Sequence, residues 1–482
     1  MKYVIAFFVP ICAVITLVGS LDNDSWFVLA EGRQIVEHGI YYTDELSMHS
    51  DFAVTVHNYG YAVIFWLIYS TFGAPGLYIF TLILFLLLLW LIYKTCMLLS
   101  NKNVNLSLIL MMLTGLVMSF GFIVTRGQMI SYIVMAALIY VLELFIATDK
   151  AKYLAWIPVL SFISINMRAA MWWMIFIVIF AYLIDAIKKP KWHLQGYRTK
   201  PMLIASLIAM AVGMLNPYGI NMILFIFRSY GVTEISNFVN EMKPFNPLSG
   251  VSLIVYIAIA AVLLLYIFGK KKYIRVRHLI LFFGLLLLGL SSKKMIGELS
   301  LIMFLPLARL YKDWQVRSPI EDSKLWMFMV SWMGIVTIAV TVCVFIEIVL
   351  KMEDKPRIAL VESLDAIDAN VPAGKEKKDL KVYVNYDNGG YVEFRGYKAF
   401  LDPRAEVFIK RGNGKADVLK EWQKAKGGRT EMQELVSKYD FDFLMVRKND
   451  PLYDYPNANY ELIYDNGDEE DGDRVYKKVE ND

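Results

Sequence analysis

Cysteine is scarce in this chain of 482 residues, and all three cysteines fall inside long apolar runs. Cys12, Cys96 and Cys343 in such surroundings behave as small hydrophobic side chains. Their positions argue against a disulfide scaffold and against a cysteine-based metal or redox centre.

Histidine is also rare, with five residues in the whole chain. Three of them, His38, His49 and His57, are close together in the sequence, at spacings of 11 and 8 residues. These spacings match no compact metal-binding motif, so a metal site built from these histidines is the less favoured interpretation.

Charge is sparse as well: charged residues make up 20% of the chain, hydrophobic residues 57%, and the mean hydropathy is +0.46. Apolar runs of about 15 residues or more recur too often for one globular core, which predicts an α-helical polytopic membrane protein. About eleven transmembrane helices are expected, at residues 3–20, 76–97, 104–124, 129–147, 152–166, 169–187, 201–216, 250–269, 277–291, 296–311 and 325–350. The first run has a Lys2 flank and ends in "VGS", so a cleavable signal peptide is an alternative for it.

The aromatic-rich segment 58–73 decides the predicted topology. If it lies along the membrane surface instead of crossing, the basic loops 188–200 and 270–277 both face the cytoplasm, as the positive-inside rule favours. The N-terminus is then cytoplasmic. Residues 21–75 form a first outer loop with interfacial helices near 25–38 and 58–72, and residues 217–249 form a second outer loop.

The end of the chain differs in charge from the rest. Residues 1–350 carry 26 Lys and Arg against 17 Asp and Glu, a net of +9, whereas residues 351–482 carry 23 against 28, a net of −5. After residue 351, strand-like pieces at 381–386, 397–401, 441–446 and 460–465 alternate with helical pieces at 416–425 and 430–439. This alternation predicts an extracytoplasmic soluble α/β domain at 351–482 beside a membrane module at 1–350. The acidic run 465–473 is typical of a solvated hairpin, and it lacks the regular ligand spacing of a calcium site.

The predicted outer face collects most of the charges that could do chemistry. Lysines and arginines are expected at outer helix ends, with Glu298 just inside the next span, and charges at the hydrocarbon boundary are costly enough to indicate function. Carboxylates on one wall of a cavity and cations on another can take a proton from a hydroxyl while holding an anionic lipid head group. The acids of the first loop are Asp22, Asp24, Glu31, Glu37, Asp44, Glu45 and Asp51, and the cations are Arg126, Arg168, Lys293 and Lys294.

Each of these groups also has a structural interpretation. Asp22 or Asp24 is placed to cap the following helix. Arg126 and Arg168 could reach lipid head groups from helix ends, and the lysine pair 293–294 could mark the end of a membrane span.

The segment "DNDSWFVLAEGRQIVEHGIYYTDELSMHS" resembles the first outer loop of bacterial GT-C-type membrane glycosyltransferases, a pattern related to dolichyl-phosphate-mannose mannosyltransferase-like proteins. The similarity continues at "TRGQ", "INMR", "LNPYG", "KKMIGELSLIMFLPLA", "NYDNGGYVEF" and "FLDPRAEVF" and covers almost the whole chain. Departures are "HNY" at His57–Tyr59, where the pattern has an acid, and Arg168, where it has a histidine. Matching positions in the first loop and the tail are Asp24, Trp26, Gly32, Arg33, Gly39, Asp44, Ser47, Gly389, Gly390, Asp402 and Arg404.

The resemblance implies a GT-C-like fold and transfer of a sugar from a polyprenyl-phosphate-linked donor to a glycan, lipid or protein acceptor, by inverting displacement on the outer face. A divalent metal, Mg or Mn, held by Asp22 and Asp24 is left open, because the resemblance implies either a base or a metal ligand among these acids. Nucleic acid is not expected as a partner, and a bacterial plasma membrane is the expected location. The expected site residues are Asp24, Asp22 and Asp44 for catalysis, Arg126, Lys293, Lys294 and Arg168 for the donor phosphate, and Arg33, His57 and Gln128 for substrate.

Other functions remain open from the sequence, among them a membrane scaffold whose outer domain binds wall polymer. A lipid-linked-glycan transporter or scramblase would need polar groups along a path through the bundle, but the central parts of the expected spans are nearly uncharged. A glycan polymerase or ligase that uses a lipid-diphosphate donor has the same expected architecture and is not separated by sequence.

Overall fold

The computed structural model describes residues 21–119, 121–187, 196–229, 235, 239, 242–244, 250–269, 273–313, 356–454, 459–466 and 472–479. Contacts divide the chain into two units. We call Met1–Val18, Tyr78–Ile223 and Ser236–Lys351 the helical unit, and Gly19–Leu77, Leu224–Ile235 and Met352–Asp482 the mixed unit.

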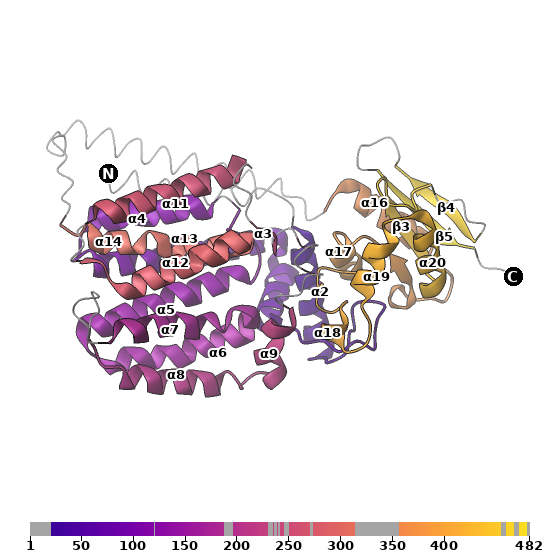
Figure 1. Cartoon of the computed structure of the whole chain (residues 1–482). Coiled ribbons are helices and arrows are strands. Elements are labelled where there is room, and N and C mark those ends of the chain that lie inside the picture. The colour runs from indigo at the N-terminus through magenta and orange to yellow at the C-terminus, as the bar shows by residue number, and fades with distance from the viewer. Residues whose placement is uncertain are drawn as a thin grey trace. The chain divides into compact units, whose positions relative to one another are not determined.

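The helical unit is built from apolar helices that pack side by side, with α5 against α6, α6 against α8 and α7 against α12 (Figure 1). The α4 helix begins where the side chain of Asn103 accepts a hydrogen bond from the Leu106 backbone N–H, at 3.1 Å. The helices are α4 (Val104–Met118), α5 (Gln128–Thr148), η1 (Ala151–Ala155), α6 (Trp156–Arg168), η2 (Ala169–Met171), α7 (Met174–Asp185), α8 (Lys200–Val212), α11 (Gly250–Phe268), α12 (Val276–Ser291), η6 (Lys293–Met295), α13 (Ile296–Met303) and α14 (Leu305–Leu310), with the second part of α3 (Tyr59–Leu99) and the first part of α9 (Ile220–Ser229).

Three helical segments of the described residues are long and apolar enough to cross a membrane: Tyr59–Leu99, Gln128–Thr148 and Ala151–Met171. Six shorter apolar helices accompany them, at Val104–Met118, Met174–Asp185, Lys200–Val212, Ile220–Ser229, Ile259–Phe268 and Val276–Ser291. A mostly helical protein with several apolar helices is thus confirmed, whereas the expected number of eleven spans is not. The expected spans 3–20 and 325–350 lie outside the described residues.

The α3 helix contains a break at Gly73, whose φ of 64° lies in the left-handed region that glycine adopts without steric cost. Pro75 follows two residues later, where a missing backbone N–H also weakens the helix. The break lies between the two helices predicted at 58–72 and 76–97, and the boundary between the two units follows it at Leu77. The surface position of the first of these helices stays a prediction.

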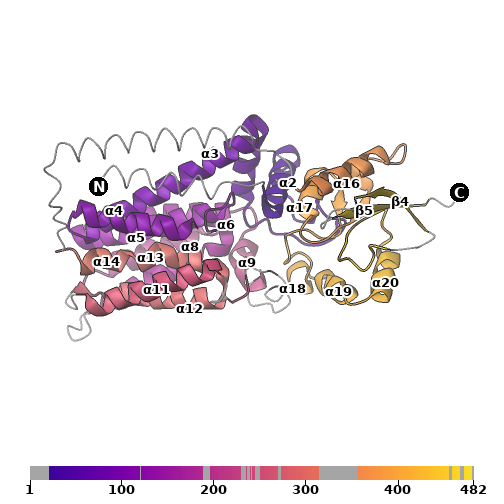
Figure 2. The ribbon, with the colours of Figure 1, turned by 90° about the horizontal axis from the view of Figure 1, so that it is seen from above.

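The mixed unit contains a five-stranded sheet in the order β2-β1-β3-β5-β4. The strands β2, β1 and β3 are parallel, and β5 and β4 extend the sheet in antiparallel fashion. Figure 2 shows α16 on one side of this sheet and α19 and α20 on the other. The elements are α2 (Asn23–His38), α16 (Ile358–Ala369), η7 (Lys377–Asp379), β1 (Lys381–Tyr383), α17 (Gly389–Phe394), β2 (Lys398–Ala399), α18 (Lys410–Asn413), α19 (Val418–Ala425), α20 (Arg429–Tyr439), β3 (Phe443–Arg447), β4 (Tyr460–Asp465) and β5 (Asp473–Lys478), together with the first part of α3 and the last part of α9.

The strands of this sheet follow the hydrophobic pattern of the tail. Val382, Leu444 and Val475 are fully buried on the three central strands, as expected for a sheet covered on both faces. The small α/β fold predicted after residue 351 is therefore present, while its outer location stays a prediction. Part of the acidic run 465–473 lies outside the described residues, and its two ends belong to the paired strands β4 and β5.

Candidate functional site

The α2 helix begins at the acids that the sequence singles out. Asp22 is its N-cap: Oδ1 accepts hydrogen bonds from the backbone N–H of Ser25 at 2.8 Å and from the Ser25 hydroxyl at 2.7 Å. Asp24 lies in the first turn, where the helix dipole favours a negative charge. Both acids are therefore fixed to the same helix end, and the capping interpretation holds for Asp22.

The residue between these two acids binds the C-terminal part of the chain. The Asn23 side chain donates from Nδ2 to the Tyr386 carbonyl and accepts at Oδ1 from the Gly390 backbone N–H, both at 2.9 Å. Tyr386 and Gly390 belong to the segment between β1 and the first turn of α17. Sequence reasoning matched Gly390 to a family pattern but did not connect it with the first loop.

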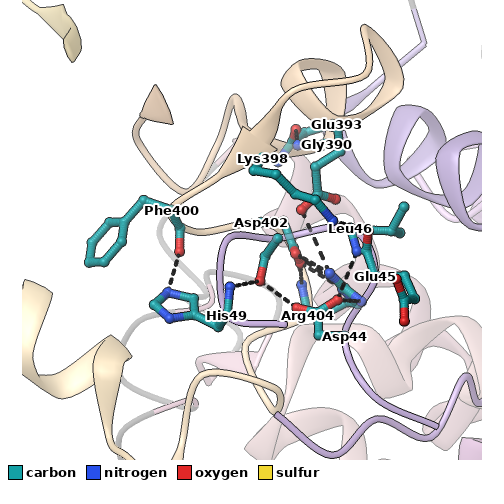
Figure 3. Close-up of polar contacts among 12 residues, drawn as sticks. Asp44, Glu45, Leu46, His49, Gly390, Glu393, Lys398, Phe400, Asp402 and Arg404 are labelled. Carbon is teal, nitrogen blue, oxygen red and sulfur yellow. Dashed lines mark hydrogen bonds and ion pairs between the residues drawn. The ribbon is translucent and has the colours of Figure 1, made fainter. Parts of the chain in front are cut away.

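The remainder of the first loop adds to the edge of the sheet. Ser47 forms a parallel β-bridge with Ala399 of β2, and the Met48 N–H donates to the Ala399 carbonyl at 3.0 Å. His49 Nε2 lies 3.1 Å from the Phe400 carbonyl (Figure 3). Burial lowers the pKa of His49, so the ring is neutral and its role here is structural.

Asp44 of this loop forms an ion pair with Arg404, whose Nη1 lies 2.9 Å from Asp44 Oδ1 (Figure 3). Asp44 also accepts hydrogen bonds from the Ser47 hydroxyl and the Leu46 N–H. Burial alone would raise the pKa of Asp44, but Arg404 and these donors outweigh it and hold the pKa below its ordinary value. The carboxylate is fully buried and charged.

Arg404 is shared among several acids. Its Nη2 lies 2.5 Å from Asp402 Oδ2, and its Nε lies 3.0 Å from Asp402 Oδ1. Glu393 is more distant, with Oε1 3.6 Å from Nη2. We call Glu31, Asp44, Glu393, Asp402 and Arg404 the acid cluster; each of its side chains is at least 97% buried.

Two members of the acid cluster have pKa values shifted in the opposite direction from Asp44. Burial raises the pKa of Glu31 well above its ordinary value, and the attraction of Arg404 only partly offsets this. Burial, and next the negative charge of Asp402, raise the pKa of Glu393 in the same way. One guanidinium cannot neutralise four carboxylates, so burial and the repulsion between the acids favour the protonated forms of Glu31 and Glu393.

The two substrate candidates of the first loop are held by other contacts of the mixed unit. Arg33 donates from Nη2 to the Glu393 carbonyl at 3.3 Å, and its guanidinium lies over the rings of Trp66 and Phe394. His57 stacks on Phe225 at 4.3 Å between ring centroids. Its Nδ1 is 3.9 Å from Glu406 Oε1.

The remaining candidates belong to the helical unit. Gln128 donates from Nε2 to the Tyr132 hydroxyl at 2.5 Å, and Arg168 donates from Nη1 to the Ser131 hydroxyl at 3.2 Å. Arg168 and Lys294 both interact electrostatically with the buried Glu298. Arg126 lies half-buried in the turn before α5, and Lys293 begins η6, so two of the four expected phosphate ligands share an acid within this unit.

The residues present do not fit the divalent metal left open by the sequence. In the part of the chain that the structure describes, no group of three or more His, Cys, Asp or Glu side chains is placed to hold a metal ion. Asp22 serves as a helix cap, and Asp44 is paired with a guanidinium. We therefore derive no step through a metal.

Comparison with solved structures identifies the fold of the chain. No protein-family model matches the chain, and no curated protein matches it by sequence. A crystal structure of the Archaeoglobus fulgidus oligosaccharyltransferase, tethered with an acceptor peptide containing the NVT sequon, matches 100% of this chain and 74% of its own, with a TM-score of 0.63 and 12% identity. The chain has a GT-C fold.

Two further structures support this fold. The archaeal oligosaccharyltransferase AglB from Archaeoglobus fulgidus, in complex with an inhibitory peptide and a dolichol-phosphate, matches over 92% of this chain and 69% of its own, with a TM-score of 0.60 and 10% identity. The same organism's oligosaccharyltransferase in complex with Zn and sulfate matches over 91% and 67%, with a TM-score of 0.51 and 12% identity. The GT-C fold expected from sequence is thereby confirmed at the level of architecture.

The GT-C fold does not by itself reveal the acid cluster. Asp402 and Arg404 stand in the pattern "FLDPRAEVF", Glu31 is one of the seven acids of the first loop, and Glu393 stands in "NYDNGGYVEF" without having been singled out as a site residue. Between 349 and 373 residues separate the first-loop members from the tail members. Only the tertiary fold brings them together.

Proposed function

We propose that this protein is an integral-membrane glycosyltransferase that moves a sugar from a polyprenyl-phosphate-linked donor to an acceptor on the outer face of a plasma membrane, with inversion at the anomeric carbon. The observation that carries the proposal is the match of the whole chain to an oligosaccharyltransferase fold. Supporting it, one of the matching structures holds a dolichol-phosphate, a lipid of the proposed donor class. A bacterial origin and an N-terminus in the cytoplasm belong to the same proposal.

Asp24 is the proposed general base. The Asp22 carboxylate accepts two hydrogen bonds from Ser25 as the helix cap, and Asp24 keeps the distance to Trp26 that the resembled family pattern has. In the proposed reaction, Asp24 takes the proton of the acceptor hydroxyl or amide as the acceptor atom attacks the anomeric carbon. The bond from that carbon to the phosphate oxygen breaks, and polyprenyl phosphate leaves with the electron pair.

The leaving phosphate needs cations. Arg126, Arg168, Lys293 and Lys294 are proposed for this role because each carries a positive charge at a helix end or a short connection of the helical unit. Arg33, His57 and Gln128 remain proposed substrate contacts. Asp44, which is buried against Arg404, is assigned to the support of the first loop and not to the reacting atoms.

A second candidate is transfer of a whole oligosaccharide, with a lipid-diphosphate donor as one form. The specific observation in its favour is that the three structures compared above are oligosaccharyltransferases. The proposed base and cations would act in the same way, and only the leaving group and the size of the transferred glycan would differ.

The test is turnover by the purified full chain in lipid discs. Polyprenyl-phosphate monosaccharides, polyprenyl-phosphate oligosaccharides and polyprenyl-diphosphate oligosaccharides are offered with an extract of acceptors, and release of polyprenyl phosphate or diphosphate is measured. Asp24→Asn is expected to lower turnover about a hundredfold or more, as loss of a general base does. The matched control is Asp51→Asn, an exposed acid of the same loop that pairs with Lys415 and is expected to keep full activity.

Each outcome of this test supports or overturns one of the proposed functions. Consumption of a monosaccharide donor supports the first proposal, and consumption of only an oligosaccharide donor supports the second. Equal activity of Asp24→Asn and wild type removes the base role from Asp24. If no donor is consumed but labelled lipid-linked glycan crosses the bilayer of reconstituted vesicles, the protein is a transporter and both transferase proposals fail. Repeating the assay with EDTA tests a metal requirement separately.

A further inference from the structure

The side-chain amide of Asn23 forms hydrogen bonds through both its nitrogen and its oxygen to a segment more than 360 residues away in the sequence. Its Nδ2 donates to the Tyr386 carbonyl and its Oδ1 accepts from the Gly390 N–H, each at 2.9 Å. Two opposed hydrogen bonds of this kind fix both the position and the rotation of the side chain. Asn23 is also the first residue of α2, directly after the Asp22 cap, so the contact is made at the first turn of the helix.

The approach of the two segments is too close for any side chain at Gly390. A Cβ at this position would lie 2.4 Å from the Asn23 carbonyl oxygen and 2.9 Å from both Asn23 Oδ1 and Phe27 Cβ. On the other side, a Cβ at Gly389 would lie 1.9 Å from the Leu401 carbonyl oxygen. The glycine pair thus lets the start of α17 lie directly between the first turn of α2 and the end of β2.

Asp24 interacts electrostatically with the same segment. Tyr386, whose hydroxyl donates to the Pro403 carbonyl at 2.7 Å, is close enough to Asp24 for the two groups to interact. The segment 386–390 therefore contacts the residue before Asp24 through hydrogen bonds and interacts with Asp24 through its tyrosine.

We propose that segment 386–390 of the C-terminal region is a positioning element of the active site: Asn23 and Gly390 together hold the first turn of α2 so that Asp24 meets the acceptor at a fixed distance. This inference rests on the proposed function, because it assigns Asn23 and Gly390 a role through Asp24. A base displaced by about 1 Å loses as much as a hundredfold in rate, whereas binding of the distant lipid and phosphate is unaffected. The predicted signature is a loss of kcat at unchanged donor KM.

The first experiment is a double-mutant cycle. Asn23→Ala is expected to lower kcat about 10- to 100-fold in the wild-type background and to have less than about a twofold effect in the Asp24→Asn background, because a positioning residue matters only while the positioned group is present. Gly390→Ala is expected to reproduce the loss through the steric clash with Asn23. Lys415→Ala is the control, since it breaks a different contact between the first loop and the C-terminal region and is expected to leave kcat unchanged.

A second measurement does not depend on activity. Hydrogen exchange of backbone amides in the full chain in lipid discs is expected to rise in the first turn of α2 in both Asn23→Ala and Gly390→Ala, and to stay at the wild-type level there in Lys415→Ala. Unchanged exchange in both variants overturns the inference, as does an additive cycle or a rise in donor KM without loss of kcat. If the wild type turns over no donor, the proposed function fails and the positioning role fails with it, and the exchange data then show whether the contact with Asn23 holds α2 in a protein of other function.

Discussion

Each unit of this protein buries arginine among carboxylates, but the two sites are balanced differently. In the helical unit, Arg277 bonds Glu143 through Nε and Nη2 at 2.6 and 2.8 Å and Asp185 through Nη1 at 2.6 Å. His278 and Val276 supply further partners, so every oxygen of both carboxylates has a hydrogen bond. In the acid cluster of the mixed unit, Arg404 serves four carboxylates, and among the described residues both oxygens of Glu393 have no hydrogen-bond partner.

This difference separates two uses of a buried charge. The Arg277 site joins α5, α7 and α12 with charges that compensate one another, as a cluster within apolar helices must. The acid cluster joins α2, the first loop, α17 and the segment after β2, and burial together with the neighbouring negative charges raises the pKa values of its two glutamates. Its charge therefore depends on pH.

The largest effect is expected from removing the cation of the balanced site. Arg277→Met preserves most of the side-chain volume but leaves Glu143 and Asp185 buried without their cation, which is expected to cost about 3–5 kcal/mol of stability. Thermal unfolding of the full chain in lipid discs measures this. Arg198→Ala is the control, because it removes an exposed ion pair with Asp149 in the same unit and is expected to cost less than about 1 kcal/mol. Equal effects of the two variants would contradict the comparison.

An intermediate effect is expected at the charged acid of the acid cluster. Asp44→Asn removes one charged partner of Arg404, but Arg404 keeps its bonds to Asp402. The free energy of unfolding of the full chain is therefore expected to fall by about 2 kcal/mol. The first loop should loosen at the same time, seen as faster amide exchange over residues 43–56. A loss as large as that of Arg277→Met would mean that Asp402 does not take over the pairing.

The sequence predicted those parts of the fold that depend on local pattern. The strand at Tyr460–Asp465 and the helices near 418–425 and 429–439 appear where alternation and helical periodicity placed them. The last strand, β5, was not predicted, because its charged residues Asp473, Arg474, Lys477 and Lys478 obscure the alternation. The number of membrane spans also cannot be predicted from the local hydrophobic pattern, because several apolar helices are short and their ends depend on packing.

Prediction of the candidate site was limited by distance along the chain. Asp22 and Asp24 were found because a helix start has a local signature, and the structure confirms Asp22 as the cap. Neither the Asn23–Gly390 contact nor the meeting of Glu31 with Arg404 has any local signal, because each depends on the C-terminal region folding beside α2. The roles of the cations in the helical unit stay predictions.

The smallest effect is expected from replacing Glu31, an acid whose pKa is raised, by glutamine. The pKa values of Glu31 and Glu393 are raised in the folded protein. The stability that these two groups contribute is therefore fully present below the ordinary glutamate pKa of 4.5, and it is lost as the pH rises toward and through the raised values. Asp44, whose pKa is lowered, behaves in the opposite way and loses its contribution only in acid. Unfolding free energy should therefore fall with rising pH above this range, by at most about 1.4 kcal/mol per pH unit for each proton retained. Glu31→Gln mimics the protonated side chain and should flatten this slope, whereas Glu37→Gln, an exposed glutamate of the same helix, should leave it unchanged. A wild-type slope of zero between about pH 5.5 and 8, or one that Glu31→Gln leaves intact, would mean that Glu31 is ionised in the folded state. The acid cluster would then need a further cation to resemble the balanced site of Arg277.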